Sequence, residues 1–201
     1  MQKLFLVIAI PLAASCATFI LLFLLLVPQQ NDVVIKEDAV KPEAILDSRT
    51  SVVISPPILL VIASINVSAV IKPVGLTSAG DMDIDENPEE LAWYQYGPMP
   101  GEEGSSVIAG HYGWKDGVPS VFNDLSKLVK GDEVIVSGKD GVPQKFVVSH
   151  SAQYKPEQDA TDVFRSDDGK AHLNLITCQG SWNNSANTYS ERLVVFTDHV
   201  K

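Results

Sequence analysis

AHLNLITCQGSWNNSANTYSERLVVF, residues 171–196, contains two apolar runs separated by a polar loop. Along residues 173–178 the side chains alternate in character with a period of two, which predicts a β-strand. The second run, residues 192–196, is rich in β-branched and aromatic side chains, as strands are. We therefore expect the two runs to pair as an antiparallel hairpin with a long loop.

The predicted hairpin brings a thiol and a guanidinium together. Cys178 ends the first run and Arg192 begins the second, so the two side chains share one rim of the sheet. A fixed cation lowers the pKa of a nearby thiol and can later stabilise an oxyanion. The other cysteine, Cys16, lies in an apolar N-terminal segment, which predicts that Cys178 is a free thiol. A lone cysteine taken by itself is more often a small buried hydrophobe.

The composition limits the class of protein. The chain has 201 residues, which suits one domain of ordinary size with additional segments. Its formal net charge is -10 and its pI about 4.7. Nucleic-acid binding proteins present basic surfaces, so a nucleic-acid partner is not expected.

The N-terminus predicts a membrane anchor. Residues 4–27 are almost wholly apolar and uncharged, and about 20 such residues span a bilayer. Lys3 precedes them, and the positive-inside rule then places the N-terminus in the cytoplasm and the rest outside. The alternative is a cleaved signal with a lipoprotein-like site at residues 13–16, but the apolar run continues well beyond Cys16. We expect an uncleaved, single-pass anchor at residues 1–28.

Residues 29–57 are charged and poorly periodic, and we interpret them as an extracellular stalk. Residues 58–201 contain many short strand patterns and few helical ones, which predicts a mostly β domain forming a closed or nearly closed barrel. Helical spacing is limited to one segment near 120–131 and one turn near 159–164. The expected strands are 59–70, broken near Asn66, then 71–74, 105–109, 133–137 and 144–154.

Three aspartates, Asp81, Asp83 and Asp85, alternate as at the start of a calcium-binding loop. Glu86 stands where that loop requires glycine, and Ala92 stands where it requires a bidentate glutamate. We therefore interpret the segment as a solvated acidic turn, and no metal site is predicted.

A cysteine nucleophile needs a base or acid partner, which is usually a histidine. His111 is the best candidate because it follows a glycine at the end of an apolar strand and enters a loop. His150 lies in the middle of a strand and is interpreted as a surface or packing residue. His172 lies about 20 Å from Cys178 along its strand at 3.3 Å per residue, and His199 is next to the C-terminus.

Three segments together resemble the signature segments of the sortase family. They are Ala109-Gly110-His111, Leu175-Ile176-Thr177-Cys178 and Arg192-Leu193-Val194-Val195. Further segments resemble the class F-like sortases, and the resemblance covers about residues 58–198. These segments are Ile71 to Leu76, Met82-Asp83, Trp93-Tyr94, Pro100-Gly101, Gly104 to His111 and Val121 to Asp132. Residues 179–191 lack the Cys-Pro continuation of some other classes, so substrate choice is not transferred from those classes.

The resemblance implies a sortase-type closed β-barrel with one or two short helices, behind a single transmembrane helix. It implies a cysteine transpeptidase in which Cys178 is the nucleophile, His111 the proton donor and acceptor, and Arg192 the holder of the substrate carbonyl or oxyanion. Thr177 is expected to contact the substrate. Implied partners are secreted proteins with a C-terminal sorting signal and an amine acceptor, either a peptidoglycan precursor or a pilin lysine. No cofactor and no metal are implied, and the catalytic domain is expected outside the cell membrane.

Two alternatives remain at this point. An L,D-transpeptidase of the cell envelope usually carries a Ser-His-Gly-Cys type motif, and Ser149-His150-Ser151 does not continue in that way. A non-catalytic, membrane-tethered binding module on the same barrel is the second alternative, because a fold does not determine a function.

Overall fold

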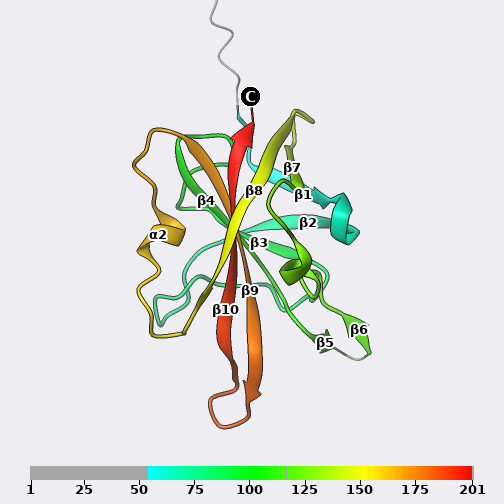
Figure 1. Ribbon diagram of the computed structural model, residues 1–201, viewed down its shortest axis with the longest axis vertical. Coiled ribbons are helices and arrows are strands. Elements are labelled where there is room, and N and C mark those ends of the chain that lie inside the picture. The colour runs from blue at the N-terminus through cyan, green and yellow to red at the C-terminus, as the bar shows by residue number, and fades with distance from the viewer. Residues whose placement is uncertain (1–53, 116, 201) are drawn as a thin grey trace, which may run out of the picture. The chain divides into compact units, whose positions relative to one another are not determined.

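The hairpin predicted from residues 171–196 is longer than its apolar runs indicate. In the computed structural model, which describes residues 54–115 and 117–200, β9 spans Ala171–Asn183 and β10 spans Thr188–Val200 (Figure 1). The two strands are antiparallel and Cys178 pairs with Arg192, as predicted. Strand pairing continues past this pair to Asn183 and Thr188, so the hairpin projects from the barrel and its connecting turn is short. The long loop predicted between the two runs is therefore wrong.

Eight strands form a closed barrel in the order β1-β2-β3-β4-β9-β10-β8-β7. The pairing of β1 with β7 closes it, and the β2–β3 and β4–β9 pairs are parallel. The mostly β, closed-barrel prediction is therefore confirmed. The remaining barrel strands are β1 Pro57–Ile62, β2 Val67–Val74, β3 Leu91–Tyr94, β4 Gly104–Gly110, β7 Glu133–Gly138 and β8 Pro143–Tyr154. A small separate sheet consists of β5 Trp114–Lys115 and β6 Val118–Pro119.

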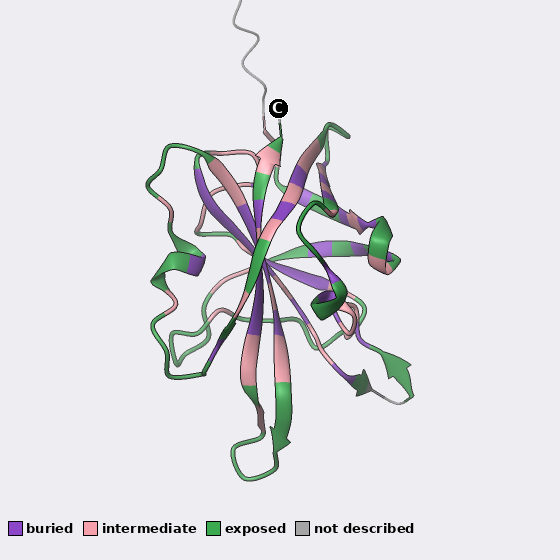
Figure 2. Ribbon diagram, viewed as in Figure 1, coloured by how far each residue is buried: buried purple, intermediate pink, exposed green. Residues whose placement is uncertain are grey.

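The core fills the inside of the barrel because alternate side chains of each strand point inward. Leu173 and Leu175 of β9 are fully buried there, together with Ile108 of β4 and Phe146 of β8. Figure 2 shows buried residues along the central parts of the strands and exposed residues at the tip of the β9–β10 hairpin. The alternation that predicted β9 is thus the alternation between the core and the outer face.

The predicted helix near residues 120–131 does not form. The segment consists of turns and one short 3₁₀ helix, η2 (Leu125–Lys127), although Phe122, Leu125 and Leu128 are all buried as their spacing suggested. Side chains spaced by three residues lie on one side of a 3₁₀ helix. Phe122, Leu125 and Leu128 can therefore all be buried without an α-helix. The other short helices are η1 (Ala63–Ile65) and the single-turn α2 (Thr161–Phe164).

The break predicted near Asn66 is confirmed, but the separate strand predicted at residues 71–74 is wrong. Asn66 has a φ of 55°, a left-handed conformation that asparagine tolerates, and it joins η1 to β2. From there β2 is continuous to Val74, since Ile71 and Val74 pair in register with β3. The Pro73 side chain does not interrupt the strand.

No helix among residues 54–115 and 117–200 is long and apolar enough to cross a bilayer. The predicted anchor at residues 1–28 and most of the predicted stalk lie outside the described residues. Their boundaries therefore remain predictions.

A chain that begins at residue 54 is expected to be more stable than one that begins at residue 58. Pro57 is buried and pairs with Gly138, and the Ser55 hydroxyl accepts a hydrogen bond from the Asp140 amide at 3.4 Å. Losing both should lower the free energy of unfolding by about 1–2 kcal/mol. The melting temperature should then fall by about 3–6 °C. Calorimetry on the two truncated chains measures both melting temperatures. Equal melting temperatures would show that residues 54–57 do not stabilise the domain.

Candidate active site

Cys178 opens onto a pocket of about 580 Å³ on the outer face of the barrel. Its floor is formed by residues 176–178 of β9 with Thr188 and Arg192 of β10. One wall comes from residues 81–84, and another comes from the connection between β8 and β9, including Val163 and Phe164 of α2. The pocket is therefore lined by both polar and apolar groups, and Cys178 is one of them.

Burial and charge act on Cys178 in opposite directions. Its side chain lies on the face opposite Leu175 and beside Arg192, its cross-strand partner. Burial raises the pKa of the Cys178 thiol, and the positive charge of Arg192 lowers the pKa by a smaller amount. The cation effect expected from the sequence is present, but burial outweighs it and the net shift of the Cys178 pKa is upward. Desolvation disfavours the thiolate more than the cation favours it.

Arg192 is held in one conformation by the second strand of the hairpin. Its Nη1 donates to the Tyr189 carbonyl oxygen at 3.1 Å and to the Glu191 carbonyl oxygen at 3.0 Å. Its Nη2 donates to Thr188 Oγ1 at 3.0 Å. A guanidinium has five N–H donors, so three are used here and two can face a bound oxygen atom. The group is thus preorganised, and it makes no salt bridge with Glu191 or Asp198 within the described residues.

Thr177 faces the barrel interior. Its hydroxyl is buried and donates to the Gly110 carbonyl oxygen at 2.7 Å. This bond joins the strand that carries Cys178 to the end of β4, directly before His111. The expected substrate contact by Thr177 stays a prediction, although the residue does border the pocket.

His111 follows β4, and its main chain is fixed by close packing. A Cβ atom on Gly110 would lie 2.6 Å from the Phe122 ring and 2.7 Å from Leu91, so only glycine fits before the histidine. The Phe122 amide donates to the His111 carbonyl oxygen at 3.1 Å. His111 Nε2 lies 2.6 Å from the Asp85 carbonyl oxygen, which can only accept, so Nε2 carries hydrogen and Nδ1 is left for proton exchange. The imidazole does not line the pocket that contains Cys178.

The acidic segment has a place at the site that the sequence interpretation missed. Met82 forms a bridge with Leu76, and the carboxylates of Asp83 and Asp85 accept hydrogen bonds from the Ile84 and Asn87 amides. The segment is thus a fixed wall that also holds His111, rather than only a solvated turn. In the sequence, the apolar side chains of Met82 and Ile84 between the aspartates indicate that this segment packs against the rest of the protein.

The β8–β9 connection is the second feature that the sequence interpretation missed. Asn174 Nδ2 donates to the Val163 carbonyl oxygen at 2.6 Å, and the Tyr154 hydroxyl donates to Asp162 at 2.6 Å. Burial, followed by this bond to Asp162, raises the pKa of Tyr154 to about 12. These two bonds hold α2 over the outer face of β9.

The other three histidines lie elsewhere on the barrel. His150 stacks flat on Phe196, with ring centroids 4.5 Å apart, which confirms the packing role expected for it. His172 lies between Asp168 and Asp198, with a nitrogen–oxygen distance of 3.0 Å to each. The bond to His172 is the main reason why the pKa of Asp168 falls to about 2. His199 lies 3.0 Å from Gln144, so none of the three approaches Cys178 along β9 or β10.

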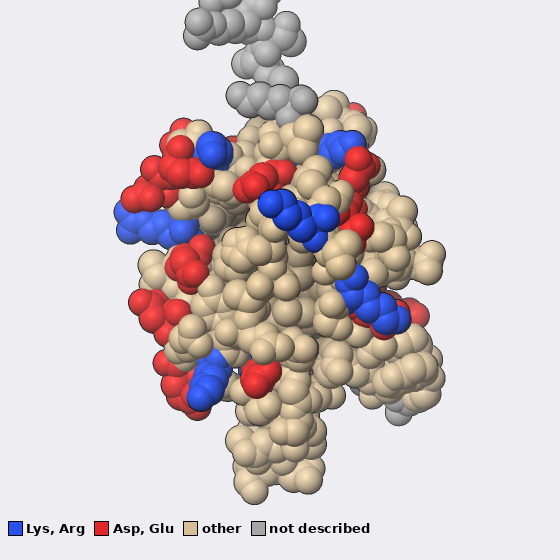
Figure 3. All heavy atoms as spheres, in the orientation of Figure 1, with Lys and Arg blue, Asp and Glu red and all other residues tan. Residues whose placement is uncertain are grey.

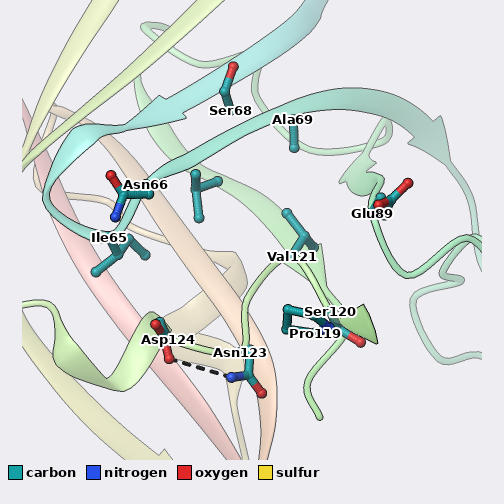
Figure 4. A pocket seen from close by; sticks show the side chains of 11 residues that line it. Ile65, Asn66, Ser68, Ala69, Glu89, Pro119, Ser120, Val121, Asn123 and Asp124 are labelled. Carbon is teal, nitrogen blue, oxygen red and sulfur yellow. Dashed lines mark hydrogen bonds between the residues drawn. The ribbon is translucent and has the colours of Figure 1, made fainter. Parts of the chain in front are cut away.

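A second pocket, of about 280 Å³, lies between the η1–β2 region and residues 119–124 (Figure 4). Asn66, Asn123 and Asp124 point into or along it, and Asn123 Nδ2 lies 3.4 Å from Asp124 Oδ1. It contains none of the candidate residues. Within the described residues, no group of three or more His, Cys, Asp or Glu side chains could hold a metal ion.

The raised pKa of Cys178 predicts the pH dependence of thiol labelling. Modification of Cys178 by MTSET, mapped by mass spectrometry, should accelerate with rising pH and reach half its maximum above the ordinary thiol pKa. Arg192→Ala should move this midpoint further upward because it removes the charge that lowers the pKa. Arg192→Lys should move it less. A midpoint below the ordinary value in the wild type would show that the cation outweighs burial.

Thr177→Val should lower both stability and any activity at Cys178. Valine keeps the shape but leaves the buried Gly110 carbonyl oxygen without its donor, at a cost of about 1–3 kcal/mol. The end of β4 should then hold His111 less firmly. Thr177→Ser is the matched control because it keeps the hydroxyl. Melting temperature and turnover should both be lower in Thr177→Val than in Thr177→Ser. Equal values in the two variants would show that the Thr177–Gly110 hydrogen bond contributes to neither.

One family model matches most of the chain. The sortase domain model matches residues 60–200, and the chain therefore belongs to the sortase family, whose members are cysteine transpeptidases. Sortase C-1 from Actinomyces oris is 30% identical, with a TM-score of 0.58 over 74% of this chain and 76% of that one. The lid mutant of sortase A from Corynebacterium diphtheriae is 23% identical, with a TM-score of 0.56 over 72% of this chain and 70% of that one. No curated protein sequence matches the chain significantly.

Clostridium perfringens sortase D5, described as a transpeptidase, is 22% identical, with a TM-score of 0.54 over 73% of this chain and 79% of that one. At this identity the likeness shows the fold alone, as it does for the Corynebacterium structure. Among these structures the Actinomyces oris enzyme is the one that also shares substantial sequence. The family is thus established, while its classes are not separated by these matches.

Proposed function

We propose that the chain is a membrane-anchored sortase of the class F-like group. In this role it cleaves the C-terminal sorting signal of a secreted protein and transfers that protein to an amine acceptor on the cell envelope. The observation that carries the proposal is the register of β9 and β10, which sets Cys178 opposite Arg192 in the lining of one pocket. The apolar run at residues 4–27 supports the anchor, and a tether would keep the barrel where exported proteins emerge.

In the proposed reaction the Cys178 thiolate attacks the scissile carbonyl of the sorting signal. Two N–H groups of Arg192 are available for the oxyanion, and the bonds to Thr188, Tyr189 and Glu191 hold the guanidinium in place. The C–N bond breaks, His111 gives a proton to the leaving amine, and a thioester remains on Cys178. An incoming amine then attacks the thioester carbonyl, its proton passes to His111, and the thiolate leaves.

The raised thiol pKa has a consequence for this reaction. Only a minority of molecules carry the thiolate at neutral pH. A rising pH forms more thiolate but removes the acid that the same reaction needs, so turnover should pass through a maximum with pH. His111 must be protonated to act as the acid, and its Nε2–H is already held by Asp85. The proton that moves in the reaction is therefore assigned to Nδ1.

A sorting-signal peptide library tests the proposal. The full-length protein in mild detergent should cleave a subset of peptides and retain the N-terminal fragment as a thioester on Cys178, visible by mass spectrometry. Adding a small amine should divert the thioester from hydrolysis to amide formation. A protein that binds peptides without forming a thioester would instead be the non-catalytic binding module. The chain belongs to the sortase family rather than to the L,D-transpeptidases, and His150, the histidine of the Ser-His segment, stacks on Phe196.

A further inference from the structure

The β8–β9 connection, residues 155–170, passes along the outer face of the strands that carry the candidate site (Figure 1). It leaves β8 after Tyr154 and enters β9 at Ala171, the end of that strand away from Cys178. Between these ends, Val163 of α2 is buried in a small apolar cluster with side chains of the strands. Because α2 lines the Cys178 pocket, the shape of the pocket depends on how firmly both ends of the connection are attached.

A histidine attaches the C-terminal part of the connection to two strands. The Nε2 atom of His172 on β9 lies 3.0 Å from Asp168 Oδ1 of the connection. Its Nδ1 atom lies 3.0 Å from Oδ1 of Asp198, its cross-strand partner on β10. We call these three residues the His172 clamp. Asp168 Oδ1 also accepts hydrogen bonds from the Ser166 hydroxyl and the Lys170 amide, at 3.0 Å each. The clamp therefore fixes the last residues of the connection to β9 and β10.

The complete clamp needs a charged histidine. An ionised carboxylate only accepts hydrogen bonds, so both ring nitrogens of His172 must carry hydrogen for both contacts to form. The bond to His172 is the largest of the causes that lower the pKa of Asp168 to about 2, so this carboxylate loses its charge only as the pH falls toward that value. Histidine is the side chain whose charge ordinarily changes near physiological pH. On the alkaline side the clamp is therefore lost when His172 gives up its second proton.

The other charged groups near the clamp do not share this behaviour. Within the described residues they include Lys170, whose ammonium is 3.8 Å from Asp168 Oδ2, and Glu103, whose carboxylate lies beside Gly169. The neighbouring strand β4, with the sequence GSSVIAG, contributes no charge. Figure 3 shows acidic and basic side chains close together over the connection, at the left of the view. Ammonium and carboxylate groups ordinarily keep their charge near neutral pH, so a change there comes from the imidazole.

We propose that protonated His172 is a positioning residue, which through the clamp holds α2 in place as the wall of the Cys178 pocket against which a sorting peptide binds. The inference rests on the proposed function, because it concerns affinity for the first substrate of that reaction. When His172 loses a proton, one carboxylate contact loses its hydrogen, the connection loosens and the peptide binds less tightly. The hydrogen bonds that Asn174 and Tyr154 donate to the connection remain, so the loss of affinity is graded.

Peptide affinity measured against pH tests the proposal. One sorting peptide is bound to full-length Cys178→Ala protein in mild detergent, with either His172 or His172→Gln, from about pH 5.5 to about pH 9. Glutamine can donate to a carboxylate but cannot carry the charge. At the acidic end, Kd should be about fivefold lower with His172, and at the alkaline end the two Kd values should be equal. The midpoint should coincide with the titration of the His172 ring followed by NMR.

The comparison isolates the clamp because both proteins share every other titrating group. A purely structural role of His172 would change Kd by the same factor at every pH. His199→Gln is the matched control, since His199 contacts Phe146 and Gln144 rather than the connection, and it should keep the pH dependence. Without any peptide, amide hydrogen exchange in residues 159–168 should be about fivefold faster in His172→Gln at the acidic end and equal at the alkaline end.

The outcomes separate the two proposals. If no sorting peptide binds or forms a thioester, the proposed function is overturned, and hydrogen exchange still decides whether the clamp exists. A Kd ratio that stays constant with pH, or equal exchange at the acidic end, would overturn the clamp and leave the proposed function intact. If His172→Gln does not fold, the wild type decides. The Val163 and Phe164 amide signals must then shift with the midpoint of the His172 ring, and a different midpoint contradicts the proposal.

Discussion

Cys178→Ala is expected to abolish both cleavage of the sorting peptide and its transfer to an amine. The proposed reaction passes through one covalent bond to this sulfur, and loss of a nucleophile commonly costs about a millionfold in turnover. Product formation should therefore fall below detection in a standard peptide assay. The fold should survive, because Cys178 is only half-buried on the outer face and the substitution removes one atom.

Cys178→Ser is the control that separates loss of the nucleophile from loss of binding. It keeps the shape and the position beside Arg192, but a hydroxyl is a far weaker nucleophile than a thiolate. Both variants should bind the sorting peptide as the wild type does and show the same melting temperature. Residual transfer above about one per cent in Cys178→Ala would place the nucleophile on another residue.

The sequence predicted the parts of the fold that depend on local alternation. In residues 173–178 one set of side chains enters the core and the other faces the pocket, so the pattern itself reports the strand and its two faces. The Cys178–Arg192 pairing followed because the register of an antiparallel hairpin determines which residues lie opposite. The helix near residue 122 was predicted wrongly, because spacing by three residues suits a 3₁₀ turn as well as a helix.

The parts of the site that could not be predicted depend on contacts between distant segments. The Asp85 carbonyl oxygen that holds His111 is a main-chain group 26 residues away, and no side-chain pattern reports a main-chain contact. The other residues that line the Cys178 pocket likewise include α2 and residues 81–84, which come from other parts of the chain. The sequence predicted the cation that lowers the pKa of Cys178, but it did not predict the larger effect of burial, which raises that pKa.

Arg192→Lys is expected to lose most of the turnover, and Arg192→Ala at least as much. Removal of one oxyanion donor typically costs about 100- to 1,000-fold. A lysine retains the charge but lacks the planar fork that reaches Thr188 and the two carbonyl oxygens while donating to a substrate. The loss should appear in kcat more than in KM, because the charge that Arg192 stabilises develops only in the transition state.

Comparing the two variants separates charge from geometry at this site. Arg192→Lys should keep the labelling midpoint of Cys178 near the wild-type pH and still lose turnover, whereas Arg192→Ala should shift the midpoint upward and lose turnover as well. If Arg192 acted only through its charge on the thiol, turnover in Arg192→Lys would stay near normal. Steady-state kinetics with one sorting peptide and parallel MTSET labelling decide this. Near-normal turnover in both variants would exclude Arg192 from the chemistry and leave only His111 and Cys178 as candidates.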